Sequence, residues 1–189
     1  EMLEAGFSTN VEFHYLHHQS SGIPYDNLSE LADRIASSAS ATGIGLTLLP
    51  VYYQYGGCGK TELTRGQIRF GNDIDRFINL AEKCAYSSKL VSYDSNSGIA
   101  AHSLRAVTLD GLNEVIKLSE QKPFHMHLAE QKAEVEEVFN FFGKRPIDLV
   151  LDNFEINPNW CLIHCTQMNA REAFSLAKTG AVAGLCPIT

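Results

Sequence analysis

The stretch PFHMHLAE, residues 123–130, decides the fold. After the opening proline its apolar residues alternate with histidines, and this period of two is typical of a β-strand. His125 and His127 therefore share one face of the predicted strand. Glu130 follows just past the strand end, where an acidic helix begins. Because an imidazole binds divalent ions and a nearby carboxylate can move protons, the pattern H-x-H-x-x-E indicates a hydrolytic metal centre.

The composition is that of a soluble globular protein. Of the 189 residues 44% are hydrophobic and 20% are charged, with a net charge of -7. An acidic chain is unsuited to non-specific nucleic-acid binding, and no apolar run approaches the roughly 18 residues that span a bilayer. We therefore expect no nucleic-acid partner, no membrane span and no signal peptide. An anionic substrate would need a local cation to hold it.

The chain contains five cysteines and no C-x-x-C pair. An odd number without paired spacing argues against a disulfide scaffold and against a zinc ribbon. We expect these cysteines to be reduced, which is typical of a cytoplasmic protein.

Strand-like and helix-like segments alternate along the chain. Strands are predicted at residues 8–14, 43–50, 98–102, 124–128, 160–165 and 181–186, and helices at residues 27–42, 73–86, 108–120, 130–142, 146–153 and 169–178. Such a run of about six βα units implies a parallel sheet.

Two α/β architectures fit this order, an open doubly wound sheet and a (β/α)8 TIM barrel. No G-x-G-x-x-G or P-loop motif opens any helix. Polar residues instead follow the ends of successive predicted strands, where barrel active sites are built: His14, His102, His127 with Glu130, and His164. We therefore favour the barrel. A complete barrel needs about 250 residues, so we expect residues 1–189 to form a single incomplete TIM-barrel domain.

Six motifs resemble the metal-dependent amidohydrolase superfamily, and within its aminohydrolase branch the formimidoylglutamate deiminases of bacterial histidine degradation. They lie in the expected order over nearly the whole chain: EFHYLHH (12–18), GLTLLP (45–50), AHSLRAV (101–107), HMHLAEQ (125–131), WCLIHC (160–165) and GAVAGLCP (180–187). The resemblance implies a partial barrel that covers roughly the second to seventh strands.

The resemblance also implies chemical roles. His127 corresponds to the fifth-strand metal ligand, and Glu130 to the residue that shuttles protons. His164 corresponds to the sixth-strand histidine that orients the attacking hydroxide or polarises the substrate. The implied cofactor is zinc or another divalent metal. The family's H-x-H pair after the first strand and its aspartate after the eighth strand have no counterpart in this sequence.

Three further residues resemble those that hold the glutamate portion of the substrate: Tyr15, His102 and Arg105. The argument for Arg105 also stands on its chemistry. A guanidinium pairs carboxylates with two parallel hydrogen bonds, and in an acidic chain an arginine just after a strand-end histidine suits a carboxylate clamp.

Purely structural interpretations remain open beside these roles. His127 would then be a hydrogen-bonded core histidine, and His125, one layer deeper, a packing residue. Glu130 would simply begin an acidic surface helix that continues through Glu134, Glu136 and Glu137.

His164 ends an apolar strand and shares its predicted face with Trp160 and Leu162. An inward-pointing imidazole needs a partner, which favours a functional role. His14 and His18 stand four residues apart but trail a strand, so loop structure or a substrate pocket is the better interpretation.

The expected function is hydrolysis of N-formimidoyl-L-glutamate to N-formyl-L-glutamate and ammonia, with a small molecule as the binding partner and a homo-oligomer as the assembly. Two alternatives stay open. One is another aminohydrolase, such as a guanine or cytosine deaminase. The other is a non-catalytic barrel fragment, and we expect the 189-residue chain on its own to be inactive.

Overall fold

The computed structural model describes residues 1–91 and 94–188. Strands and helices alternate as predicted. The elements are β1 (Thr9–His14), α1 (Glu30–Thr42), β2 (Gly45–Tyr52), α2 (Ile74–Ser88), β3 (Ser95–Ser97), β4 (Ile99–Ala101), α3 (Leu109–Ser119), β5 (Phe124–Leu128), α4 (Lys132–Phe142), α5 (Pro146–Asn153), β6 (Trp160–His164), α6 (Ala170–Ala177) and β7 (Val182–Gly184).

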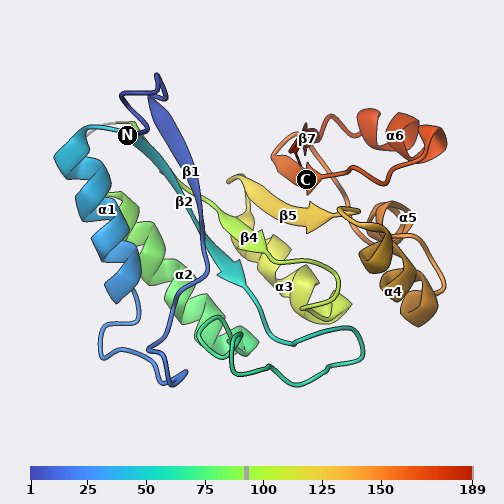
Figure 1. Ribbon diagram of the computed structural model, residues 1–189, viewed down its shortest axis with the longest axis horizontal. Helices are drawn as coiled ribbons and strands as arrows, with labels where there is room; N and C mark the ends of the chain where they lie inside the picture. The colour runs from blue at the N-terminus through green and yellow to red at the C-terminus, as the bar shows by residue number, and fades with distance from the viewer. Residues whose placement is uncertain (92–93, 189) are drawn as a thin grey trace.

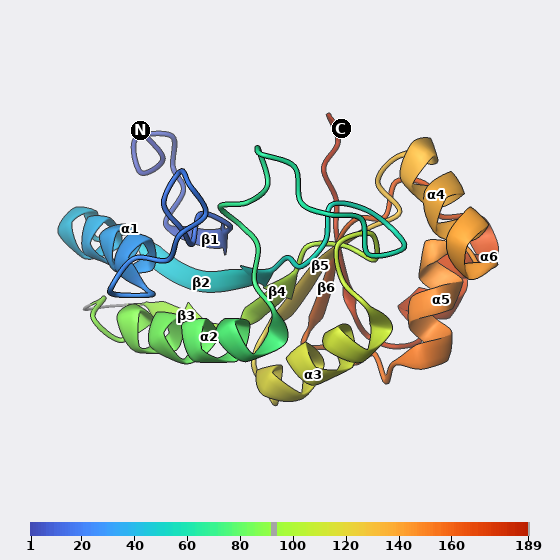
Figure 2. The ribbon, with the colours of Figure 1, turned by 90° about the horizontal axis from the view of Figure 1, so that it is seen from below.

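The strands form one parallel sheet in the order β1-β2-β4-β5-β6-β7, with β3 paired to β2. The sheet curls, and the helices lie along its outer side (Figure 1, Figure 2). Strands β1, β2, β4, β5 and β6 are each followed by a crossover that returns the chain to the same end, which is the geometry of a parallel βα fold. This half-barrel confirms the predicted fold class.

Alternation along β5 separates the core from the inner face of the sheet. Phe124, Met126 and Leu128 are fully buried on the side that packs against helices, whereas His125 and His127 are only partly buried on the other side. Full burial of such apolar side chains contributes about 1.5–3 kcal/mol each. Burial of one set of residues therefore fixes the register that turns both histidines inward.

Local signals set where the helices begin and end. The Thr108 side chain accepts a hydrogen bond from the Gly111 amide at 3.0 Å, which is the N-cap expected for α3. Gly143 has a φ of 72° and ends α4 in the left-handed conformation that glycine adopts without strain. Among the described residues, no helix is both long and apolar enough to cross a membrane.

The predicted strand at residues 98–102 differs from the structure. Only Ile99–Ala101 (β4) is strand within this range, and a second short strand that was not predicted, β3, lies on the other side of Gly98. A Cβ atom at this glycine would collide with the carbonyl oxygen of Pro123, so the backbones approach here more closely than any side chain permits.

Candidate active site

Five polar side chains meet at the carboxyl edge of the sheet. Tyr15 directly follows β1, and His102 directly follows β4. His127 lies within β5, Glu130 comes two residues after the end of β5, and His164 ends β6. Since the carboxyl ends of parallel strands share one edge, strand order alone brings these distant residues together. The structure thus gathers residues that the sequence marked as candidates, while their roles stay proposals.

Hydrogen bonds join three of them. The Tyr15 hydroxyl lies 2.7 Å from Nδ1 of His102 and 3.4 Å from Nδ1 of His127. Nδ1 of His127 also lies 3.1 Å from the carbonyl oxygen of His102. Because a carbonyl oxygen only accepts, Nδ1 of His127 donates, and its Nε2 keeps the lone pair. Metal-binding histidines are oriented by the same kind of bond from the second ring nitrogen to a carbonyl.

His164 and Glu130 complete the group. The His127 and His164 ring centroids are 5.5 Å apart, and a Glu130 carboxylate oxygen lies 3.7 Å from Nε2 of His164. Nδ1 of His164 is buried and has no hydrogen-bond partner among the described residues. Burial also lowers the pKa of His127, which favours the neutral imidazole that metals bind.

This donor set fits a zinc-type ion in part. Imidazole and carboxylate are groups that zinc binds, and the lone pair of His127 Nε2 is free to do so. Within the part of the chain that the structure describes, no three His, Cys, Asp or Glu side chains group closely enough to hold a metal. His127 therefore fits as a ligand, and a closed coordination shell would need donors beyond this group.

The backbone beside these residues is strained. Ala129, His164 and Cys165 have φ angles of 51°, 73° and 54°, in the left-handed region that residues other than glycine rarely adopt. The two turns are also tied together, since the Cys165 amide donates to the carbonyl of Leu128 at 2.9 Å. Strain of this kind persists only where the surroundings impose it, and it clusters at functional sites.

This strain corrects one prediction. Regular alternation places His164 on the same face as Trp160 and Leu162, which pack in the core. The positive φ of His164 breaks the alternation at the last strand residue. Its ring consequently lies beside that of His127, although His127 belongs to the opposite face of the sheet.

Aromatic side chains that the sequence did not mark surround His102. The ring of Tyr53 stacks on His102 at 4.7 Å with an interplanar angle of 24°, and Phe70 lies 5.6 Å from Tyr15. Burial, with the nearby His127 and Arg105, lowers the pKa of His102 to about 3, so its ring is neutral. Tyr53 lies one residue past the end of β2, and this position after a strand is the sequence signal that could have marked it as a site candidate.

Arg105 lies beside this group and has an acidic partner. Its Nη1 atom is 3.9 Å from a carboxylate oxygen of Glu137 on α4, whose other oxygen accepts a hydrogen bond from the Cys58 amide at 3.0 Å. Nε of Arg105 is buried without an acceptor among the described residues. A cavity of about 330 Å³ borders Arg105 and Cys58. The arginine thus retains a donor for an anion.

Two histidines outside this group, His17 and His18, have hydrogen-bond partners. Nε2 of His17 bonds to the carbonyl oxygen of Val51 at 3.1 Å. Nε2 of His18 lies 3.0 Å from both the carbonyl oxygen of Gly71 and the side-chain oxygen of Asn72. These bonds tie the loop after β1 to the neighbouring strand and loop, which favours the loop-structure interpretation over the substrate pocket.

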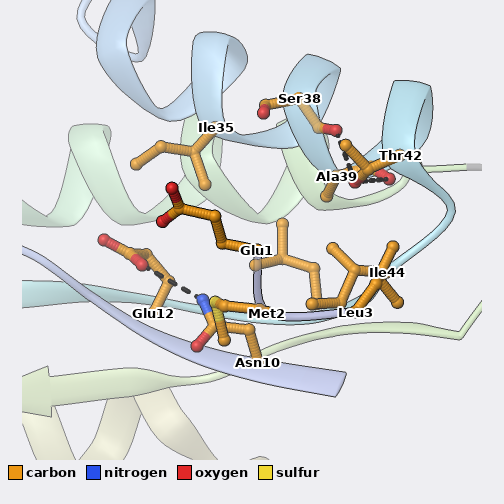
Figure 3. Close-up of a pocket in the computed structure, with 11 residues that line it drawn as sticks. Glu1, Met2, Leu3, Asn10, Glu12, Ile35, Ser38, Ala39, Thr42 and Ile44 are labelled. Carbon is orange, nitrogen blue, oxygen red and sulfur yellow. Dashed lines mark hydrogen bonds between the residues drawn. The ribbon is translucent and has the colours of Figure 1, made fainter. Parts of the chain in front are cut away.

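One sizeable pocket lies away from this site. It has a volume of about 450 Å³ and lies between β1 and α1, where residues 1–3 cover it (Figure 3). Its polar lining includes Asn10 and Glu12, which hydrogen-bond each other at 3.2 Å. None of the five side chains at the carboxyl edge lines it, so its size carries no functional argument.

Comparison with known proteins finds relatives of this chain. No family model matches the chain. A formimidoylglutamate deiminase from Pseudomonas aeruginosa is 40% identical over 187 residues, which are 98% of this chain and 41% of that protein. The crystal structure of an amidohydrolase from Brucella melitensis superposes with a TM-score of 0.95 at 50% identity, over 99% of this chain and 42% of that one. Over nearly its whole length the chain is thus similar to part of a formimidoylglutamate deiminase and to part of an amidohydrolase.

A more distant amidohydrolase fold supports the same architecture. The crystal structure of a zinc-bound adenosine deaminase from Xanthomonas campestris has a TM-score of 0.64 at 19% identity, covering 79% of this chain and 32% of that one. At this identity the likeness concerns the fold alone. The chain spans about two fifths of the length of the P. aeruginosa and B. melitensis relatives, so the activity of a whole amidohydrolase remains a proposal for this chain.

Proposed function

We propose that this chain carries part of the active site of a metal-dependent deiminase. The reaction is hydrolysis of N-formimidoyl-L-glutamate to N-formyl-L-glutamate and ammonia, a step of histidine degradation. The main support is the hydrogen-bonded group of Tyr15, His102 and His127 beside Glu130 and His164, in a chain 40% identical to a formimidoylglutamate deiminase.

The reaction needs water to add to the formimidoyl carbon and a nitrogen to leave as ammonia. A zinc-type ion held through His127 supplies Lewis acidity, which brings the pKa of water to about 7. The Glu130 carboxylate takes a proton from the attacking water and passes it to the imino nitrogen. It then moves the hydroxyl proton of the tetrahedral adduct to the same nitrogen, which leaves as ammonia while the C=O bond forms. The His164 ring, 3.7 Å from Glu130, donates a hydrogen bond to the oxygen at the tetrahedral carbon. Proton transfer of this kind contributes about 10²–10⁴ in rate.

The other end of the substrate carries two carboxylates. Arg105 offers its unfilled Nε donor to one of them, and a charge-assisted bond of this kind is about twice as strong as a neutral one. The Tyr15 hydroxyl and His102 border the same space, and both are uncharged because burial raises the pKa of Tyr15 and lowers that of His102. They orient the substrate without repelling Arg105.

The test is ammonia release by the whole protein that carries this chain, purified with Zn²⁺, because the 189-residue chain on its own is expected to be inactive. We expect release from N-formimidoyl-L-glutamate and none from guanine, cytosine or adenosine, with at least a 100-fold loss in Glu130→Gln. The matched control is Glu136→Gln, an exposed carboxylate on α4 that should retain full activity. Release from a nucleobase alone, or none from any substrate, would overturn the proposal for this chain.

A non-catalytic role is the second candidate, and the sheet edges favour it. Strands β1 and β7 each have one neighbour in the described sheet, and unpaired edges promote association between chains. Metal analysis and sedimentation discriminate the two. Near-stoichiometric zinc with turnover supports the enzyme, whereas a metal-free, inactive oligomer supports the non-catalytic role.

We further propose that the whole protein acts in the cytoplasm on a small molecule and assembles as a homo-oligomer. The five free thiols are consistent with a reducing compartment. Sedimentation at several concentrations tests the assembly, and a concentration-independent monomer would contradict it.

A further inference from the structure

Glu134, in the first turn of α4, has a buried carboxylate with an unusual pair of partners. Only 4% of the residue is exposed. One carboxylate oxygen accepts a hydrogen bond from the Ala129 amide at 3.0 Å, and the other accepts one from the Glu130 amide at 2.7 Å. Both oxygens are thus committed to the turn that follows β5.

These bonds do not serve as an ordinary helix cap. A glutamate three residues inside a helix usually bonds the amide of the capping residue itself. In α4 the N-cap is Gln131, whose side chain makes no capping bond. Its amide contributes to the surroundings of Glu134, but the bonds at 3.0 and 2.7 Å come from the amides of the two residues before it. The carboxylate therefore organises the turn between the strand and the helix.

That turn is strained at one residue and carries a functional candidate at the next. Ala129 has a φ of 51°, and a left-handed residue other than glycine costs about 1–2 kcal/mol. Its amide is held by Glu134, and its carbonyl accepts from the Gln167 amide at 2.8 Å. Both backbone groups of Ala129 are thereby fixed, and this imposes the direction in which Glu130 leaves the turn.

We propose that Glu134 is a positioning residue, which clamps the backbone of Ala129 and Glu130 so that the Glu130 carboxylate faces His164. The inference rests on the proposed function only for the role given to Glu130, because the clamp itself is a structural claim. Burial raises the pKa of Glu134, and the amide donors and the nearby Arg105 oppose that rise. Both carboxyl oxygens accept hydrogen bonds from amides, which is the arrangement that suits a carboxylate, and charge-assisted bonds of this kind are strong.

The first test is amide hydrogen exchange, followed by NMR on the 189-residue chain. In Glu134→Ala the amides of Ala129 and Glu130 should exchange roughly 10- to 100-fold faster, since hydrogen bonds to a charged group are lost. The amide of Met126, within β5, should be unchanged. Glu134→Gln preserves side-chain volume and keeps one acceptor oxygen, so it should free one of the two amides and leave the other protected.

The matched control is Glu136→Gln, the same chemical change at an exposed position of the same helix. It should exchange as the unmodified protein does. The second readout is the ¹⁵N signature of the His164 ring, which should shift in both Glu134 variants because Glu130 moves away, and stay unchanged in the control. Unaltered exchange at both turn amides, or an unaltered His164 ring, would overturn the proposal.

Kinetics separate this inference from the proposed function. In Glu134→Gln the kcat for ammonia release should fall by roughly 10- to 100-fold while KM changes less than about twofold, since proton transfer and not substrate binding is misaligned. A raised KM with an unchanged kcat would contradict a positioning role for Glu134, because it would indicate weaker substrate binding instead. These kinetics are measured on the whole protein. An unmodified whole protein without turnover would refute the proposed function, whereas the exchange and ring signals of the 189-residue chain would still decide the role of Glu134.

Discussion

Replacing Glu172 by alanine should remove about 3–4 kcal/mol from the free energy of unfolding. Glu172 is fully buried in α6, and its carboxylate accepts from Nε of Arg145 at 2.6 Å and from Nη2 at 3.1 Å. It also accepts from the Asn169 amide at 2.8 Å, as half of a capping box. The network links α5, α6 and the loop that follows His164.

The magnitude follows from these contacts. Breaking a buried ion pair by removing one partner costs about 3–5 kcal/mol. One third of the Arg145 side chain is exposed, and its Nη2 also donates to the carbonyl oxygen of Gln167 at 2.6 Å, so water can partly replace the lost carboxylate. We therefore take about 3 kcal/mol for the pair and up to about 1 for the cap. In a chain of this size that lowers Tm by about 6–16 °C.

Urea unfolding followed by circular dichroism measures this change. The matched control is Asp148→Ala, which breaks the pair that Asp148 forms with the largely exposed Arg171 at 2.6 Å. Surface pairs contribute about 0–1 kcal/mol, so the control should lose less than about 1. A loss below about 1 kcal/mol in Glu172→Ala, equal to the control, would refute the reasoning that burial makes this pair matter.

Three further changes test other parts of the structure. His17 has a pKa lowered by burial to about 3 against 6.5 when unfolded, so below pH 6.5 the unfolded state binds a proton that the folded state does not. Stability should therefore fall by about 2 kcal/mol between pH 6.5 and pH 5 from this group, and a urea midpoint no less pH-dependent in His17→Asn would contradict this. Tyr15→Phe removes the 2.7 Å partner of His102 and should lower kcat/KM about tenfold with stability almost unchanged, whereas equal kinetics would exclude a role for the hydroxyl. Gly98→Ala forces a Cβ against the Pro123 carbonyl and should cost about 1–3 kcal/mol by thermal unfolding; a neutral result would mean that the backbones can separate.

Most of the fold was predictable because burial and periodicity agree along the chain. The helix predicted at residues 146–153 matches α5 to the residue. Strand β3 was missed because Ser95–Ser97 is polar and carries no apolar alternation. Its pairing is supplied by its neighbour β2, which is information that local sequence does not contain.

The site was predictable to the level of position but not of orientation. Strand alternation gave the inward face of His125 and His127 correctly. It grouped His164 with the core, because a positive φ at a strand end is invisible to a period of two. The open alternative of an acidic surface helix through Glu134 does not hold at this residue, since Glu134 is buried against backbone donors that only the folded turn presents.

The left-handed residues at the carboxyl edge limit how heat-resistant this edge can become while it still works. Glycine at Ala129 or His164 would relieve about 1–2 kcal/mol, so a library screened only for thermal tolerance should accumulate glycine at both positions. Glycine at position 164 would remove the imidazole. Glycine at position 129 would let the Glu130 carboxylate adopt several orientations. Selection for durability and selection for chemistry would then pull these two positions in opposite directions.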